Sequence, residues 1–553
     1  MQQCRPVDTS DSTLARVARQ FSTWAASSPA FAARYARFNG ELAQLWIATL
    51  ARERGEQVVP LVPPDPTDRR FASKSWQASP FYDYLRQSYL LGVRFLNEVV
   101  EQADLSPHEK GLLRFLTRQY VDAIAPTNFA ATNPEVIALA IASRGETLAR
   151  GVRNLVADLE KQRISTVDEA AFEVGRNLAT TEGAVVFENE LMQLIEYRPS
   201  TAKVFARPLL MVPPCINKFY VLDLQPANSF VRYAVAQGHS VFMVSWRNPD
   251  AAQGSLGWDD YIEDGVLRAI RVAREITKSA ALNVLGFCVG GTLAATALAV
   301  LAARGERSVA SLTLLATLLD FEDAGEIGHF VDTQSVAARE AALGAGGILP
   351  GRELGLVFSA LRDNDLIWSY VVGNYLKGDA PAAFDILYWN ADSTNLPGPM
   401  YCWYLRNMYL ENRLRESGAL TVCGESVDLG RLAMPAYVLA TREDHIVPWQ
   451  SAFRACDLLG GETRLVLGAS GHIAGVINPP AAGKRSFRTG PRAKSPDAWF
   501  AQARETPGSW WDDWSAWIGA SAGARVNARR TLGNRKYRSI EPAPGRYVKQ
   551  RIA

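Results

Sequence analysis

The sequence predicts an α/β fold with a mostly parallel sheet, preceded by an all-helical amino-terminal domain. In the first third of the chain, apolar residues recur at three- and four-residue spacing, which is the period of a helix. After residue 181, short apolar runs alternate with helical patterns, as in a parallel sheet with crossover helices. With 553 residues, 48% of them hydrophobic, the chain is long enough for one large core and a second domain.

The predicted helical domain covers residues 1–170. Helical patterns run over residues 13–59, 80–122 and 134–159. Residues 60–66 are rich in proline, which lacks an amide donor and clashes with the preceding helical turn. This segment is therefore expected to be a linker.

The predicted α/β domain covers residues 171–553. It opens with two β-prone runs, residues 184–187 and 194–197, that fit a hairpin. The strands expected after this hairpin are residues 209–212, 240–246, 282–285, 311–319, 436–440 and 464–467.

Two segments of this domain fall outside the alternating pattern. Residues 321–434 are rich in helix formers and aromatic residues and contain a flexible Gly-Ala-Gly-Gly stretch at 344–347. An insertion of this size between late strands predicts a lid over the site. Residues 510–517 hold four tryptophans and predict a packed carboxyl-terminal helix rather than a polymer-binding face.

Composition and charge narrow the function classes. Lys and Arg number 59 and Asp and Glu number 57, a net charge of +2, so no overall field favours nucleic acid. Residues 1–13 lack the basic-then-apolar run of a secretory signal, and no later stretch reaches the roughly 18 apolar residues of a membrane span. The sequence therefore predicts a cytoplasmic protein without a nucleic-acid partner.

The cysteines are spread over the chain, at Cys4, Cys215, Cys288, Cys402, Cys423 and Cys456. No C-x-x-C pair occurs among them, which argues against a metal site and against a disulfide framework. We therefore expect a functional cysteine to act as a single thiol, with no bound metal and no cofactor.

One motif marks a candidate nucleophile. Residues 285–292 read Leu-Gly-Phe-Cys-Val-Gly-Gly-Thr, between an apolar strand and a helical run. In the nucleophile elbow of the α/β-hydrolase fold, glycines two residues on either side of the nucleophile let a strand turn abruptly into a helix. The motif predicts that Cys288 is the nucleophile; the alternative is a buried cysteine in a tight turn.

The same motif predicts part of an oxyanion hole. A cysteine at a helix amino terminus is favoured as the thiolate, and the amide of Val289 points to where an oxyanion would form. A second donor is expected from the loop after the strand at residues 209–212. In that loop Cys215 or Ile216 would supply the amide, while the Cys215 side chain itself is expected to fill the core.

The base and the acid follow from chain order. The fold places nucleophile, acid and histidine at the ends of successive strands. Of the histidines, His108 and His239 precede Cys288 and His329 lies in the insertion, which leaves His445 and His472.

His472 ends a strand that runs into a glycine-bounded turn, so it is the predicted base. Asp444 follows the preceding strand and is the predicted acid, with Glu443 as a rival and a turn or helix-cap role as the alternative. His445 either assists this pair or caps the loop.

These residues and many around them resemble the polyhydroxyalkanoate synthases, in particular the single-subunit class. The similarity runs from about residue 68 to residue 548, and the family's catalytic set falls on Cys288, Asp444 and His472. The matching stretches are residues 68–71, 132–135, 213–223, 245–250, 395–399, 442–449, 468–480 and 541–547. The first 60 residues match poorly. In the insertion, residues 361–365 have Asp363 where the family commonly has proline, which we expect to alter the stiffness of a loop.

The resemblance implies the activity and the partners. It implies polymerisation of (R)-3-hydroxyacyl-CoA, with 3-hydroxybutyryl-CoA as the expected monomer, through an acyl group on Cys288 and with release of CoA. It also implies a homodimer without an obligatory second subunit, associated with the surface of polyester granules. Two alternatives stay open: a cysteine-dependent thioesterase or lactone hydrolase of the same fold, and a catalytically silent lipid- or granule-binding protein.

Overall fold

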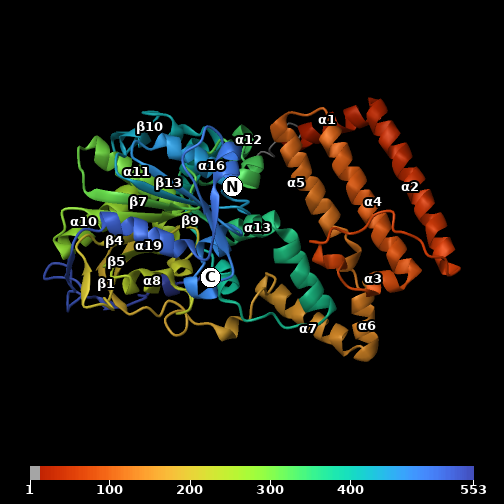
Figure 1. Cartoon of the computed structure of the whole chain (residues 1–553), viewed down its shortest axis with the longest axis horizontal. Coiled ribbons are helices and arrows are strands. Elements are labelled where there is room, and N and C mark those ends of the chain that lie inside the picture. Colours follow the sequence, from red (N-terminus) through yellow and green to blue (C-terminus); the bar gives the residue numbers. More distant parts are fainter. Residues whose placement is uncertain (1–12, 553) are drawn as a thin grey trace, which may run out of the picture. The chain divides into compact units, whose positions relative to one another are not determined.

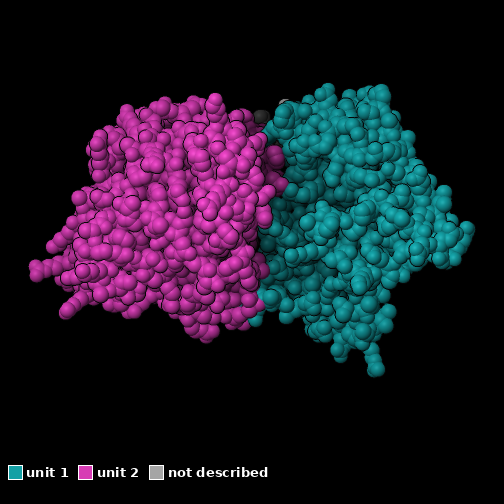
Figure 2. Space-filling view, in the orientation of Figure 1, with its two compact units in different colours: residues 1–168, 358–382 teal, residues 169–357, 383–553 magenta. Residues whose placement is uncertain are grey.

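The computed structural model describes residues 13–552, so the polar start of the chain and Cys4 lie outside the described part. The chain divides into two compact units (Figure 2): residues up to 168 with residues 358–382, and residues 169–357 with residues 383–553. The first unit is helical and the second contains a large mixed sheet, which confirms the predicted fold class. Within residues 13–552, no helix is both long and apolar enough to cross a membrane.

Each of the three helical stretches predicted in the first unit consists of two helices (Figure 1). Ser28 and Ser106 each cap a helix that begins with proline, which separates it from the helix before, and Gly145 separates the third pair with a φ of +86°. The helices are α1 (Thr13–Ser27), α2 (Pro29–Glu53), α4 (Pro80–Gln102), α5 (Pro107–Ala123), α6 (Pro134–Ala142) and α7 (Glu146–Lys161).

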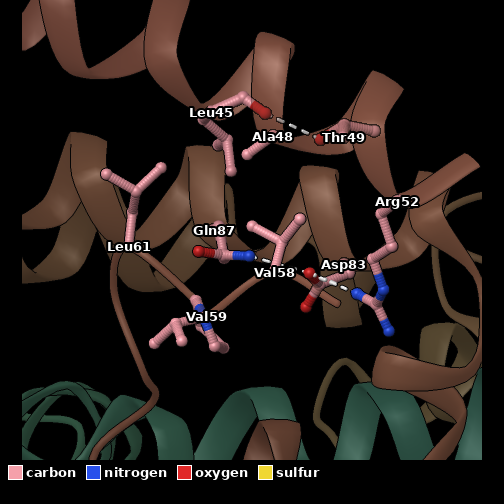
Figure 3. Close-up of a pocket in the computed structure, with 10 residues that line it drawn as sticks. Leu45, Ala48, Thr49, Arg52, Val58, Val59, Leu61, Asp83 and Gln87 are labelled. Atoms are coloured by element: carbon pink, nitrogen blue, oxygen red, sulfur yellow. Dashed lines mark hydrogen bonds and ion pairs between the residues drawn. The ribbon is translucent and has the colours of Figure 1, made fainter. Parts of the chain in front are cut away.

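Residues 13–60, part of the stretch that matches the family poorly, contribute to the packing of the helical unit. Phe38 of α2 stacks on Phe95 of α4 with ring centroids 4.8 Å apart, and Arg37 binds Glu98 at 3.0 Å. The segment after α2 folds back over α2 and α4, so that Val58 and neighbouring residues line a hollow (Figure 3). Asp83 in this hollow is already bound by Arg52, Arg86 and Gln87, the last at 2.7 Å, so it offers no free charge to a ligand.

Residues 68–71, one of the stretches that resemble the polyhydroxyalkanoate synthases, have a structural role in the helical unit. The guanidinium of Arg70 binds Asp68 at 2.9 Å and Asp122 of α5 at 2.8 Å, and it also donates to Tyr89 of α4. Tyr89 in turn donates to the carbonyl of Val121 at 3.0 Å. Arg70 therefore joins α4 and α5 inside the helical unit.

Residues 358–382, part of the predicted insertion, pack within the helical unit. The π-helical segment η10 (Val371–Leu376) lies directly on α7: a Cβ atom on Gly151 would fall 1.9 Å from the carbonyl oxygen of Tyr375. The Tyr375 hydroxyl donates to Asp158 at 2.7 Å, and Lys377 binds Glu135 at 2.7 Å. The insertion at residues 321–434 is therefore divided between the two units.

Asp363, which stands where the resembling family has proline, is helical rather than in a loop. It directly precedes the π-helical segment η9 (Asn364–Trp368) and is 3% exposed. Burial, together with the nearby Asp122 carboxylate, raises the pKa of Asp363 to about 6. The substitution therefore affects packing within the helical unit, not the stiffness of a loop.

The second unit is built on an 11-stranded sheet whose central strands are parallel. The order is β15-β14-β13-β12-β7-β6-β4-β5-β2-β1-β17, and the strands beyond β13 and β5 are antiparallel. Their bounds are β1 (Gly183–Glu188), β2 (Met192–Tyr197), β4 (Leu209–Val212), β5 (Val241–Trp246), β6 (Leu282–Phe287), β7 (Val309–Leu315), β12 (Ala436–Thr441), β13 (Thr463–Gly468), β14 (Ser486–Thr489), β15 (Arg504–Pro507) and β17 (Glu541–Pro542). The predicted runs thus match the core strands, except that β7 ends at Leu315 because Ala316 adopts a left-handed φ of 44°.

Two helices show how the faces of the sheet are covered. Helix α11 (Val289–Ala303) belongs to the same core cluster as Leu312 and Leu314 of β7. The intervening Thr313 accepts a hydrogen bond from the indole of Trp514 in α19 (Trp510–Ser521) at 3.0 Å. Because successive side chains of a strand point to opposite faces, α11 and α19 cover opposite faces of the sheet. The tryptophan-rich carboxyl-terminal helix is packed, as predicted.

Candidate active site

Cys288 lies in a sharp turn between β6 and α11. Its backbone has φ 53° and ψ −129°, a conformation that non-glycine residues rarely adopt and that is found where a site imposes it. The amide of Cys288 donates to the carbonyl of Leu315 at the end of β7, at 2.9 Å, which fixes the turn to the sheet. Cys288 is half-buried and lies at the carboxyl end of β6.

The glycines of the elbow are required by close backbone contacts. A Cβ atom on Gly286 would fall 2.3 Å from the Cα of Gly291. A Cβ atom on Gly290 would fall 2.3 Å from the carbonyl oxygen of Val212 and 2.4 Å from that of Pro213. The predicted motif therefore brings the start of α11 into direct contact with the loop after β4.

Asp444 and His472 form a buried pair. The Nδ1 atom of His472 lies 2.7 Å from Oδ2 of Asp444, and the Asp444 side chain is fully buried. The other carboxylate oxygen accepts the amides of Ile446 and Val447, each at 2.9 Å. Burial opposes ionisation of Asp444, but the charge and hydrogen bond of His472 and these two amides hold the pKa of the carboxyl below its usual value.

His472 connects this carboxylate to the cysteine. Its ring stacks on Phe287, the residue before Cys288, with centroids 5.5 Å apart, and Cys288 acts on the imidazole electrostatically. Burial disfavours the imidazolium, but the negative charge of Asp444, with a contribution from Cys288, outweighs it and raises the pKa of His472. The arrangement therefore places a basic imidazole, held by Asp444, beside the Cys288 thiol.

The predicted oxyanion donors lie around the elbow. Val289 is the first residue of α11, so its amide has no carbonyl acceptor within its own helix. Cys215 is buried, and burial raises the pKa of its thiol to about 12, so its side chain is an unreactive filler. Within residues 13–552, no backbone carbonyl accepts the amide of Cys215 or Ile216.

The remaining acidic and histidine candidates are placed as follows. Glu443 is exposed, whereas Asp444 faces His472. His445 is half-buried, with its carbonyl oxygen against Gly325, and its accessory role stays a prediction. His239 is buried between Phe205 and Trp514, and His108 belongs to α5 of the helical unit. Among residues 13–552, no group of three or more His, Cys, Asp or Glu side chains could hold a metal ion.

Two tyrosines near Cys288 were not predicted from the sequence. Tyr404 of α15 (Gly398–Tyr404) and Tyr409 of η11 (Leu405–Leu410) pack edge to face, with centroids 5.4 Å apart. Burial raises both pKa values, and the charge of the Cys288 thiolate contributes to the rise. Both residues come from the predicted insertion, whose aromatic content alone does not distinguish them from ordinary core.

The fold and the elbow together define a protein of the α/β-hydrolase class. Residues 208–479 match the family described as the alpha/beta hydrolase fold. Residues 67–234 match the family described as the amino terminus of poly-beta-hydroxybutyrate polymerase (PhaC).

Several curated relatives are similar over most of the chain. The poly(3-hydroxyalkanoate) polymerase subunit PhaC of Cupriavidus necator is 55% identical over 93% of this chain and 87% of the relative. The poly(3-hydroxyalkanoate) polymerase of Methylorubrum extorquens is 42% identical over 100% of this chain and 91% of the relative, and the PhaC subunit of Rhizobium meliloti is 42% identical over 93% and 84%. The chain belongs to the poly(3-hydroxyalkanoate) polymerase family.

Proposed function

We propose that this chain polymerises (R)-3-hydroxyacyl-CoA, with 3-hydroxybutyryl-CoA as monomer, into polyhydroxyalkanoate through an acyl group on Cys288. Membership of the family, the hydrogen bond between Asp444 and His472, and the electrostatic interaction of His472 with Cys288 support the proposal. The observation that carries the mechanism is that a thiol, not a hydroxyl, occupies the elbow beside the buried histidine.

The first step is acylation of Cys288. His472 takes the thiol proton, and the thiolate attacks the carbonyl carbon of the thioester substrate. The negative charge on the tetrahedral oxygen is held by the Val289 amide and by a second amide, from Cys215 or Ile216. When the intermediate collapses, the carbon–sulfur bond to CoA breaks and CoA leaves with the proton from His472.

Elongation uses a different nucleophile. The 3-hydroxyl of the next monomer must lose its proton, and a hydroxyl ionises far less readily than a thiol. Neutral His472, oriented by Asp444, removes this proton as the oxygen attacks the thioester on Cys288. An ester bond forms, the carbon–sulfur bond to Cys288 breaks, and the chain, longer by one unit, is carried on the CoA of the incoming monomer. The Cys288 thiolate then attacks that new thioester, and CoA leaves with the proton from His472.

Exclusion of water decides between polymer and free acid. Tyr404 and Tyr409 are buried near Cys288, and Trp258 stacks on Tyr404 with centroids 5.4 Å apart. This aromatic wall keeps water from the acyl group, so that the hydroxyl of the next monomer is the acceptor. A cysteine thioesterase would use the same three residues with water as the acceptor.

The proposal extends to assembly. The chain acts as a homodimer without a second kind of subunit, in the cytoplasm and at the surface of the polyester granules that it forms. The measurement for these points is the oligomeric state of the purified chain alone, followed by its co-sedimentation with newly formed polymer.

The decisive experiment supplies (R)-3-hydroxybutyryl-CoA and follows both thiol release and insoluble product. We expect both to appear together, and both to be lost in Cys288→Ala. Cys423→Ala is the matched control because Cys423 is also half-buried, yet burial raises the pKa of its thiol to about 12. Thiol release with only free acid would identify a thioesterase, and the absence of thiol release would refute the proposed reaction.

A further inference from the structure

Trp246, the last residue of β5, holds the loop that contains Cys215. Its indole Nε1–H donates to the carbonyl oxygen of Pro213 at 2.9 Å. Trp246 as a whole residue is only 4% exposed. The ring packs on Tyr261 with centroids 5.2 Å apart. A Cβ atom on Gly265 would fall 2.8 Å from the far edge of the indole, so the helix containing Gly265 leaves the ring no room to shift.

The chain between this hydrogen bond and the Cys215 amide has little freedom. Pro214 lies between Pro213 and Cys215, and a proline ring fixes φ near −65°. Once the Pro213 carbonyl is held, the ψ angle of Pro214 is the one soft torsion that sets the direction of the Cys215 amide. On the other side, the carbonyl of Ile216 accepts the amide of Thr394 at 2.9 Å.

The held loop lies against the elbow itself. The carbonyl oxygens of Val212 and Pro213 approach Gly290 so closely that no side chain fits there. Loss of the indole donor would leave the buried Pro213 carbonyl unpaired in this contact, and such a group turns toward another donor or toward water. Because Pro214 has no amide hydrogen, the first donor to turn with this carbonyl would be the amide of Cys215.

We propose that Trp246 is a positioning residue whose indole N–H directs the second oxyanion donor of the Cys288 site. The inference rests on the proposed function, because an oxyanion forms only if Cys288 attacks an acyl carbonyl. Trp246 has no role in forming the thiolate, which depends on His472 and Asp444.

The test compares two reactions of Cys288 in Trp246→Phe. Acylation by (R)-3-hydroxybutyryl-CoA passes through an oxyanion, whereas alkylation by iodoacetamide displaces iodide at a saturated carbon and does not. We expect the variant to lose about tenfold or more in kcat for CoA release, with KM little changed, because misdirecting an oxyanion donor costs less than removing it, which costs about 10²–10³-fold. The rate of alkylation should stay within about twofold of the parent's, since the thiolate is unaffected.

Trp514→Phe is the matched control. It removes an indole hydrogen bond of 3.0 Å from a fully buried tryptophan, but the acceptor is Thr313 in the sheet, away from the loop. This control should keep both rates. Pro214→Ala, which frees φ while leaving the indole in place, should repeat the selective loss of acylation even if Trp246→Phe does not fold.

Parent-like acylation in both Trp246→Phe and Pro214→Ala would overturn the inference, as would a parallel loss of acylation and alkylation. Failure of the proposed function would look different from failure of this inference. In that case the parent enzyme itself would release no CoA, although iodoacetamide would still alkylate Cys288.

Discussion

Asp444→Asn separates the two chemical steps that the site performs. In the native site, one carboxylate oxygen accepts two backbone amides at 2.9 Å and the other accepts His472 Nδ1 at 2.7 Å. In the variant, the amide oxygen of asparagine would take the position that faces the two backbone donors. Its NH2 group would then point at Nδ1 of His472, so the ring proton would move to the nitrogen that faces Cys288.

The size of the effect differs between the steps. A histidine with its proton on the wrong nitrogen no longer accepts one from the incoming hydroxyl, and general-base catalysis is worth about 10²–10⁴-fold. We therefore expect chain growth to slow about a hundredfold or more, which corresponds to about 2.7 kcal/mol in the barrier. Loading of Cys288 should suffer less, because a thiol ionises far more readily than an alcohol.

Mass spectrometry of the intact variant after brief exposure to (R)-3-hydroxybutyryl-CoA measures loading directly, and polymer yield measures growth. Glu443→Gln is the matched control, because Glu443 is the adjacent carboxylate but is exposed. We expect an acyl group on Cys288 with little polymer in Asp444→Asn and parent-like behaviour in the control. A variant that never loads, or that elongates as well as the parent, would refute the reasoning.

Three further predictions follow from the same geometry. His472→Gln should abolish CoA release and His445→Gln should be milder; the reverse order would identify His445 as the base. Burial and the nearby Arg525 lower the pKa of His239 from 6.5 to about 4, so the unfolded chain binds a proton first as the pH falls. Between pH 6.5 and 5 this should remove about 2 kcal/mol of the free energy of unfolding, measured in urea. His239→Phe should lack that part of the pH dependence, and an unchanged pH profile would contradict the assignment. Gly290→Ala should lower the unfolding midpoint and abolish CoA release, because its Cβ would fall 2.3 Å from a backbone carbonyl. Gly40→Ala, in a helix with open space around it, should instead stabilise by up to about 1 kcal/mol, and equal behaviour of the two would refute the contact argument.

The core of the catalytic unit could be predicted because its signals are local. The run at residues 282–287 is buried along its whole length, and all of its residues except Asn283 are apolar or glycine, which favours a buried strand. The glycines around Cys288 mark the turn, and the order of strands in this fold places Asp444 before His472. The distance of 2.7 Å between these two side chains agrees with that order.

Other features depend on contacts between distant segments, which no local pattern records. Strand β15 (Arg504–Pro507) is polar and mostly exposed, so no apolar run marks it. Residues 358–382 resemble the rest of the insertion in composition, yet they pack on α7 of the helical unit. The contact of Trp246 with Pro213, 33 positions earlier in the chain, is likewise visible only in the folded structure.

The placement of residues 358–382 means that the chain passes between the units three times, after residues 168, 357 and 382. A fragment that ends at residue 168 would keep Gly151 and Asp158 but lose the backbone and the Tyr375 hydroxyl that cover them. The helical unit therefore cannot be grafted onto another enzyme by a single exchange of chain ends. Recombination between relatives should succeed only when the amino-terminal helices and this internal segment are inherited from the same parent.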